Sequence, residues 1–193
     1  MKTTKLILPA LILFLCSCST DVSDLAEPIP AEASQLIDSK DEVSLKGLGF
    51  VADNPKVAKE LSLLRTTLAN IRTFEDVMDA GWNAQLTDWW VNMGYHYGNM
   101  DYLLDGEFVI DQPEAILISC APNGDPVAVG VEYLIPSSDP TSPPEGFSGD
   151  ADVWSYNSDL SLWTLHCWIK KPNPSGIFMA MNPEVPAEAC FVP

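Results

Sequence analysis

The first strong pattern of apolar and polar positions in this sequence is a helical stripe that begins near residue 54. Apolar side chains recur along it at spacings of four, three, four and three residues: Val57, Leu61, Leu64, Leu68 and Ile71. This spacing puts them on one face of an α-helix. We expect the helix to begin at Asn54-Pro55, because asparagine is a good N-cap and proline suits the first helical position.

A second, shorter helix is predicted over Phe74–Ala80. Thr73 precedes it as a cap, Asp76 stands in the capping-box position, and Gly81 follows as a terminator. The two helices form a pair at the N-terminal end of the folded part of the chain.

Beyond Gly81 the pattern changes to that of β-strands. The runs Ala115–Cys120 and Val127–Ile135 flank a strong turn signal, PNGD at 122–125, and together they predict an antiparallel hairpin. Alternation in the second run assigns one set of side chains to one face (Val129, Val131, Tyr133, Ile135) and the rest to the other (Gly130, Glu132, Leu134).

Two further strands are predicted, at Leu160–Ile169 and Gly176–Met181. Helices come first along the chain and strands afterwards. The sequence therefore predicts an α+β domain, in which the N-terminal helical pair packs on an antiparallel β-sheet.

The N-terminus has the features of an export signal. Lys2 and Lys5 precede an apolar run from Leu6 to Leu15. A run of about ten residues is too short to cross a hydrocarbon core of about 30 Å, which takes about 20 helical residues, but it suits a secretory leader. Residues 1–17 are predicted to be such a leader.

The end of this leader, LCSC at 15–18, resembles the bacterial lipoprotein signal, although Cys16 at position −2 is unusual. The resemblance implies that Cys18 becomes the first mature residue and carries acyl chains that anchor the protein to a membrane. The alternative is an ordinary cleaved leader. Ser19 stands where an inner-membrane retention signal tends to have aspartate, which favours the outer membrane of a Gram-negative cell envelope.

Composition divides the rest of the chain into a tether and one domain. Residues 18–50, rich in Asp, Glu, Ser, Ala and Pro, are predicted to be an acidic flexible tether, and residues 51–193 a single domain. The net charge is −17, and loss of Lys2 and Lys5 with the leader makes it −19. Such a charge repels phosphate backbones and anionic lipid, so it argues against nucleic acid as a partner.

Three cysteines remain in the predicted domain: Cys120, Cys167 and Cys190. An oxidising compartment allows one disulfide and one odd thiol, and the sequence leaves the pairing open. Their spacings match no zinc pattern. Cys120 and Cys167 lie in apolar strands, where small buried hydrophobes are expected.

Two histidines and one glutamate interrupt apolar patterns. His96 lies in NMGYHYGN (92–99), Glu132 is the one charge in Val127–Ile135, and His166 lies in WTLHCWI (163–169). Burying such groups is unfavourable unless they are partnered. They are the candidate site residues.

Five segments resemble, in the same order, those of an uncharacterised family of exported bacterial proteins: MGYHYGN, QPEAILI, VGVEYLIP, LHCWI and NPSGIFMAMNP. The likeness covers about residues 57–183. It implies one domain type and export, and it implies no reaction. The chain departs from the family at Trp89-Trp90-Val91, where relatives often have a cysteine-containing stretch.

Two hypotheses for the three residues follow. Two imidazoles and one carboxylate are a ligand set for zinc or non-haem iron, with Tyr95, Tyr97 and Asn99 available to support or orient a ligand. On this hypothesis the chain is a metal-binding protein or a metal-dependent enzyme. The separations of 36 and 34 residues suit ligands on three separate strands.

The other hypothesis is a buried polar network that holds the sheet together without chemistry. On this view the domain is a structural module, or one that binds a small ligand or an envelope protein. The sequence favours this second hypothesis, because it carries no specific catalytic motif.

Overall fold

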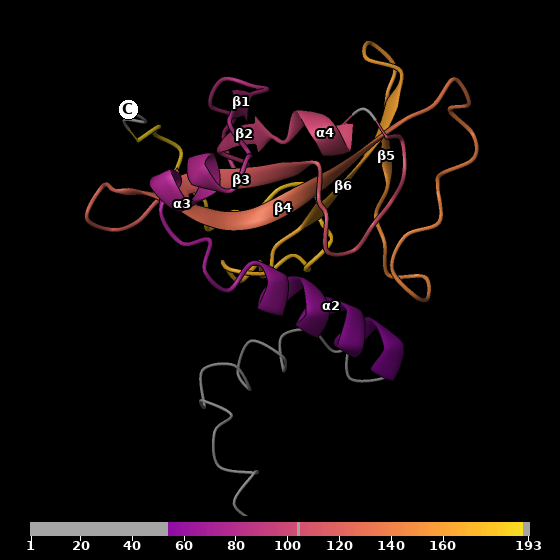
Figure 1. The fold of residues 1–193 in the computed structure, drawn as a ribbon, viewed down its shortest axis with the longest axis horizontal. Helices are drawn as coiled ribbons and strands as arrows, with labels where there is room; N and C mark the ends of the chain where they lie inside the picture. The colour runs from indigo at the N-terminus through magenta and orange to yellow at the C-terminus, as the bar shows by residue number, and fades with distance from the viewer. Residues whose placement is uncertain (1–53, 104, 191–193) are drawn as a thin grey trace, which may run out of the picture. The chain divides into compact units, whose positions relative to one another are not determined.

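A computed structural model of the chain describes residues 54–103 and 105–190, all within one structural unit (Figure 1). The predicted leader, Cys18 and the predicted tether lie outside the described residues.

The centre of the structure is a six-stranded antiparallel sheet. In spatial order its strands are β1 (Ala84–Gln85), β2 (Tyr95–Gly98), β3 (Ala115–Cys120), β4 (Pro126–Pro136), β6 (Leu162–Cys167) and β5 (Ser155–Asn157). β3 and β4 form the predicted hairpin, with Gly124 at the positive φ that its tight turn requires. The predicted α+β class and its antiparallel sheet are confirmed.

Three helices accompany the sheet in the described residues. α2 (Pro55–Thr67) begins after Asn54, whose side chain accepts hydrogen bonds from the backbone N–H groups of Lys56 and Val57. α3 (Phe74–Asp79) begins with a complete capping box, and α4 (Met100–Leu103) is a single turn. No described helix is both long and apolar enough to span a bilayer.

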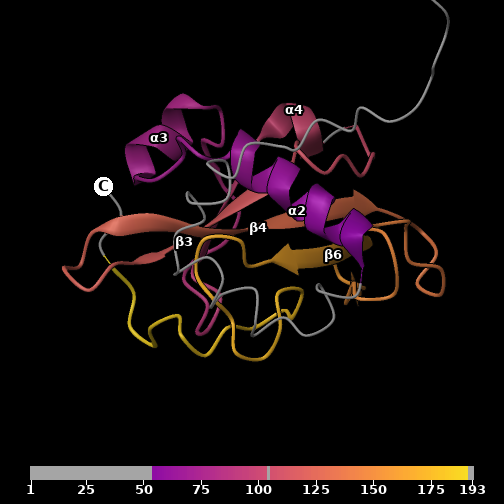
Figure 2. The same cartoon turned by 90° about the horizontal axis from the view of Figure 1, so that it is seen from below.

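The helix α2 covers one face of the sheet, as the two perpendicular views show (Figures 1 and 2). The main core lies on that face. It joins buried side chains of the helices to those of the sheet: Val57, Leu61, Leu64, Phe74 and Val77 with Ile116, Val131, Tyr133 and Leu165. Each such aliphatic side chain contributes about 1.5–3 kcal/mol through its burial. A smaller cluster of Leu117, Val129, Trp168 and Val185 includes side chains from the opposite face.

The alternation predicted for β4 is wrong at Val129. Leu117 of β3 pairs with Gly130, but the next residue, Ile118, pairs with Ala128. Val129 is therefore the extra residue of a β-bulge, and it packs with Leu117 rather than with Val131. A period-two pattern cannot show where a strand gains a residue.

Two further predictions are wrong. Gly176–Met181 is not a strand, because Gly176 adopts a positive φ and the N–H of Met179 donates back to the Gly176 carbonyl in a turn. Cys120 is not a buried hydrophobe but forms a disulfide with Cys190, at the end of a strand and beside the C-terminal segment. Cys167 is buried, as predicted, and it is the cysteine that stays a free thiol.

Candidate metal centre

The strand register brings His96, Glu132 and His166 together on one face of the sheet. Glu132 of β4 pairs with His166 of β6 on one side and with Ala115 of β3 on the other. His96 belongs to β2, beyond β3, and pairs with Leu117. Ala115 and Leu117 are two residues apart, so all these side chains share a face. Since Ala115 carries only a methyl group, the side chains of His96 and Glu132 meet across β3.

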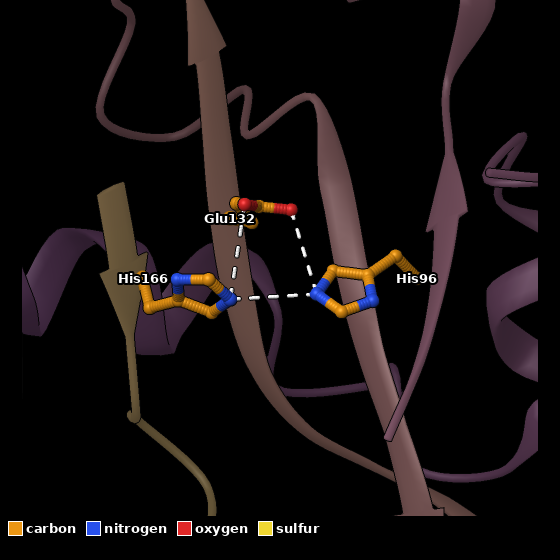
Figure 3. Close-up of side chains that lie close together, drawn as sticks. All are labelled: His96, Glu132 and His166. Atoms are coloured by element: carbon orange, nitrogen blue, oxygen red, sulfur yellow. Dashed lines mark hydrogen bonds and ion pairs between the residues drawn. The ribbon is translucent and has the colours of Figure 1, made fainter. Parts of the chain in front are cut away.

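The polar atoms of the three residues converge on one point (Figure 3). The Nε2 atoms of His96 and His166 are 3.4 Å apart. The two carboxylate oxygens of Glu132 each face one imidazole: Oε2 lies 3.6 Å from His96 Nε2, and Oε1 lies 3.7 Å from His166 Nε2. Among the described residues this is the one group of histidine, cysteine and carboxylate side chains that could hold a metal ion.

Burial decides the protonation of this group. His96, Glu132 and His166 are only 4, 7 and 4% exposed. Desolvation lowers the pKa of His96 to about 4, and desolvation together with His96 lowers the pKa of His166 to about 3. Desolvation, with a contribution from Glu114, raises the pKa of Glu132 to about 8. Without a cation at pH 7, the group is therefore two neutral imidazoles and a protonated carboxyl, and not a set of ion pairs.

Neighbouring residues hold the imidazoles in place. Thr87 Oγ1 lies 2.8 Å from His96 Nδ1. With the proton on Nδ1 donated to this hydroxyl, the lone pair of Nε2 points at the centre of the group. The ring of Trp168 stacks on His166, with planes 13° apart and centroids separated by 6.0 Å.

A second buried glutamate lies near the group without joining it. Glu114 is 1% exposed, its Oε2 accepts a hydrogen bond from the N–H of Leu134, and its Oε1 has no partner. Burial raises its pKa to about 8. Glu114 therefore affects the electrostatics of Glu132 from outside the convergence point.

The three residues line a pocket of about 610 Å³. Most of the remaining lining is apolar and includes Leu86, Trp90, Met93, Leu103, Leu134 and Leu162. Such a volume suits a small-molecule site, for which about 300–1,000 Å³ is typical. An ion at the convergence point would therefore be reachable by a ligand in the pocket.

The structure uses Tyr95, Tyr97 and Asn99 elsewhere. Alternation along β2 turns both tyrosines away from His96, and Tyr97 packs edge-on against Phe74 in the main core. The Asn99 side chain accepts a hydrogen bond from Asp101 at the start of α4. None of the three lines the pocket, so our expectation that they support a ligand is corrected.

Sequence reasoning missed Thr87 and the apolar pocket. Period-two alternation places Trp168 on the face of His166, and in the structure Trp168 directly follows β6 and stacks on that imidazole. Thr87 lies in an irregular segment after β1, nine residues from His96, and no local pattern links the two.

Comparison with known proteins adds no relative to this picture. No protein-family model, curated protein or solved structure matches the chain. The resemblance seen in the five sequence segments stays a prediction, and the geometry of His96, Glu132 and His166 supports the functional argument.

Proposed function

We propose that this protein is a lipid-anchored protein of the cell envelope that holds a zinc ion with His96, Glu132 and His166 and uses that ion to bind a small molecule. The observation that carries the proposal is the convergence of two imidazole Nε2 atoms and one carboxylate, 3.4 to 3.7 Å apart, in the wall of a pocket.

The spacing of the ligand atoms favours zinc over octahedral iron. A tetrahedral ion with bonds of about 2.1 Å holds its ligand atoms about 3.4 Å apart. Three ligands on one face of an octahedral ion with the same bonds lie about 3.0 Å apart. The two Nε2 atoms, 3.4 Å apart, match the tetrahedral value, whereas the 3.6 and 3.7 Å contacts involve different oxygens of Glu132 and so do not measure one set of three ligand atoms. Three protein ligands leave the fourth position open to the pocket.

The two imidazoles lie within hydrogen-bond distance of each other, but the distances to Glu132 argue against a purely structural network. Within the described residues, neither Glu132 oxygen has a hydrogen bond, and its contacts with the imidazoles are 3.6 and 3.7 Å. A buried carboxylate that stabilises a sheet is expected to accept hydrogen bonds at about 2.7–2.9 Å. An ion between the three groups would satisfy all of them at once.

The pocket favours ligand binding over acid–base catalysis. Apart from the three metal-ligand candidates, the titratable residue in its lining is Tyr156, whose hydroxyl already donates to the Ser137 carbonyl at 2.9 Å. A zinc-bound water could still be activated, but the pocket lining has no carboxylate or histidine besides the three candidate ligands to take its proton. Coordination of a ligand is the simpler use of the site.

The cellular address rests on the N-terminal sequence. The LCSC segment supports lipidation of Cys18, and Ser19 supports the outer membrane. The Cys120–Cys190 disulfide supports export, because such bonds persist in oxidising compartments. Metabolic labelling with palmitate tests this address. Label should enter the intact chain and be absent from Cys18→Ala, and an unlabelled intact chain would overturn the lipid anchor.

Metal analysis tests the site itself. Mature protein made without a polyhistidine tag should hold close to one zinc per chain after equilibration, and His96→Ala and His166→Ala should each lose it. Glu132→Gln should also lose zinc, whereas the matched control Glu114→Gln should keep it. Both variants remove a buried carboxyl, but only Glu132 faces the imidazoles. A wild-type chain that stays metal-free after soaking in zinc, iron and copper would contradict the proposal.

A further inference from the structure

Resting on the zinc site proposed above, we infer that the ligand is an apolar small molecule with one metal-binding group at its end and no other charge. The inference concerns the pocket rather than the ion. It follows from where the apolar side chains lie, from the charges that the lining lacks, and from the net charge of the ion with its ligands.

Apolar side chains lie both in the wall of the pocket and at its rim. Leu134 and Leu162 belong to β4 and β6, the strands that carry Glu132 and His166. At the rim, Trp90 and Leu160 are 56% and 67% exposed although both are large and apolar. Exposed apolar side chains that gather at one pocket mark a ligand-binding surface more often than a plain protein surface. The body of the ligand is therefore apolar.

The lining offers no partner for a charged body. It contains no lysine or arginine, and its carboxylate is Glu132, which the ion would occupy. A charged group on the body of the ligand would lose its hydration on entering the pocket, and no charged side chain there would compensate for that loss. The polar side chains near the mouth, such as Ser155 and Ser158, are uncharged.

The ion limits the charge of the ligand's head group. Zinc carries two positive charges, and coordination by an ionised Glu132 leaves one. A head group that is neutral, or that becomes a single anion when it coordinates, is therefore favoured over a dianion. Hydroxamic acids have this property, since they are neutral in water near pH 7 and lose one proton on binding a metal.

A hydroxamate series tests this inference on zinc-loaded mature protein. Benzohydroxamic acid should bind at least about tenfold more tightly than acetohydroxamic acid, because its ring buries apolar surface against the lining. 4-Carboxybenzohydroxamic acid should lose most of that gain. Equal affinity for the benzo and aceto compounds would overturn the inference.

Two adjacent residues supply a matched pair of variants. Trp90 lines the pocket and Val91 does not, yet they are 56% and 55% exposed. Trp90→Ser should reduce the preference for the benzo compound several-fold without changing zinc content, and Val91→Ser should leave both unchanged. Leu160→Ser should act like Trp90→Ser; a full preference in both pocket variants would contradict the assignment.

The zinc titration performed before any hydroxamate is added separates the two proposals. No zinc uptake overturns the proposed function. Stoichiometric zinc uptake without a preference for the apolar hydroxamate overturns only the ligand class.

Discussion

Replacing Glu132 with glutamine should make the metal-free protein less sensitive to alkaline pH. Burial raises the pKa of Glu132 from its ordinary value of 4.5 to about 8. Between these two values the folded chain holds a proton that the unfolded chain has released, so the free energy of unfolding falls as pH rises. Glutamine has nearly the same shape and does not titrate.

The size of the effect follows from the pKa shift. Each pH unit between the unfolded and folded pKa values lowers the free energy of unfolding by about 1.4 kcal/mol. From pH 6 to pH 8, and allowing for ionisation in the folded state near pH 8, Glu132 alone should destabilise the wild-type chain by about 2 kcal/mol. His96 and His166 act in the opposite direction, because their unfolded pKa of 6.5 lies inside this window and their folded pKa values are lower; together they add roughly 1–2 kcal/mol of stability from pH 6 to pH 8. Wild type and Glu132→Gln share this contribution, so it cancels in the difference between them.

Urea unfolding in EDTA at pH 6, 7 and 8 measures this difference. The gap between Glu132→Gln and wild type should shift in favour of the variant by about 2 kcal/mol over the range. Glu75→Gln, which removes an exposed carboxylate from α3, should follow the wild-type curve. Parallel curves for wild type and Glu132→Gln would refute the reasoning, because they would show an ionised Glu132 in a stabilising network. In a parallel series without EDTA, added zinc should stabilise the wild type more than the variant.

Three other changes are predicted. Zinc binding at pH 6.5 should release about one proton per ion, because Glu132 is protonated in the free site and both imidazoles are neutral. Calorimetry in buffers of different ionisation enthalpy measures the number of protons released. Zero release would contradict the raised pKa of Glu132. Thr87→Val should weaken zinc binding about 10–100-fold by removing the hydrogen-bond partner of His96 Nδ1. Competition with a chromophoric chelator measures the zinc affinity. An unchanged affinity would contradict the role of Thr87 in orienting His96. Cys120→Ser should lower the free energy of unfolding by about 4 kcal/mol, since the disulfide closes a sequence separation of 70 residues; a loss below about 1 kcal/mol in urea unfolding would contradict this account.

The elements that short-range chemistry specifies were predictable from the sequence. Asn54 and Thr73 cap their helices as expected, and the PNGD turn joins β3 to β4. His96, Glu132 and His166 stood out because each interrupts an apolar strand. Their convergence is a consequence of strand order, and no local pattern specifies that order.

The errors share one physical cause, which is tertiary context. The bulge at Val129 depends on how β3 pairs with β4, and the positive φ of Gly176 depends on a turn that the apolar run did not reveal. Tyr95 and Tyr97 are close to His96 in sequence, but the pleat of β2 sends them into the main core. The partner of Cys120 lies 70 residues away and follows from the path of the C-terminal segment.

The Glu132–His166 pairing on neighbouring strands has a consequence for how the ion would come and go. Ladder hydrogen bonds and the helix-covered core hold β2, β4 and β6 whether or not the ion is present. Zinc fingers, in contrast, unfold when a chelator strips them. We expect this domain to remain folded after chelation and to reload reversibly. The fraction of chains that carry zinc would then follow the supply of free ion around the cell, instead of being set once when each chain folds.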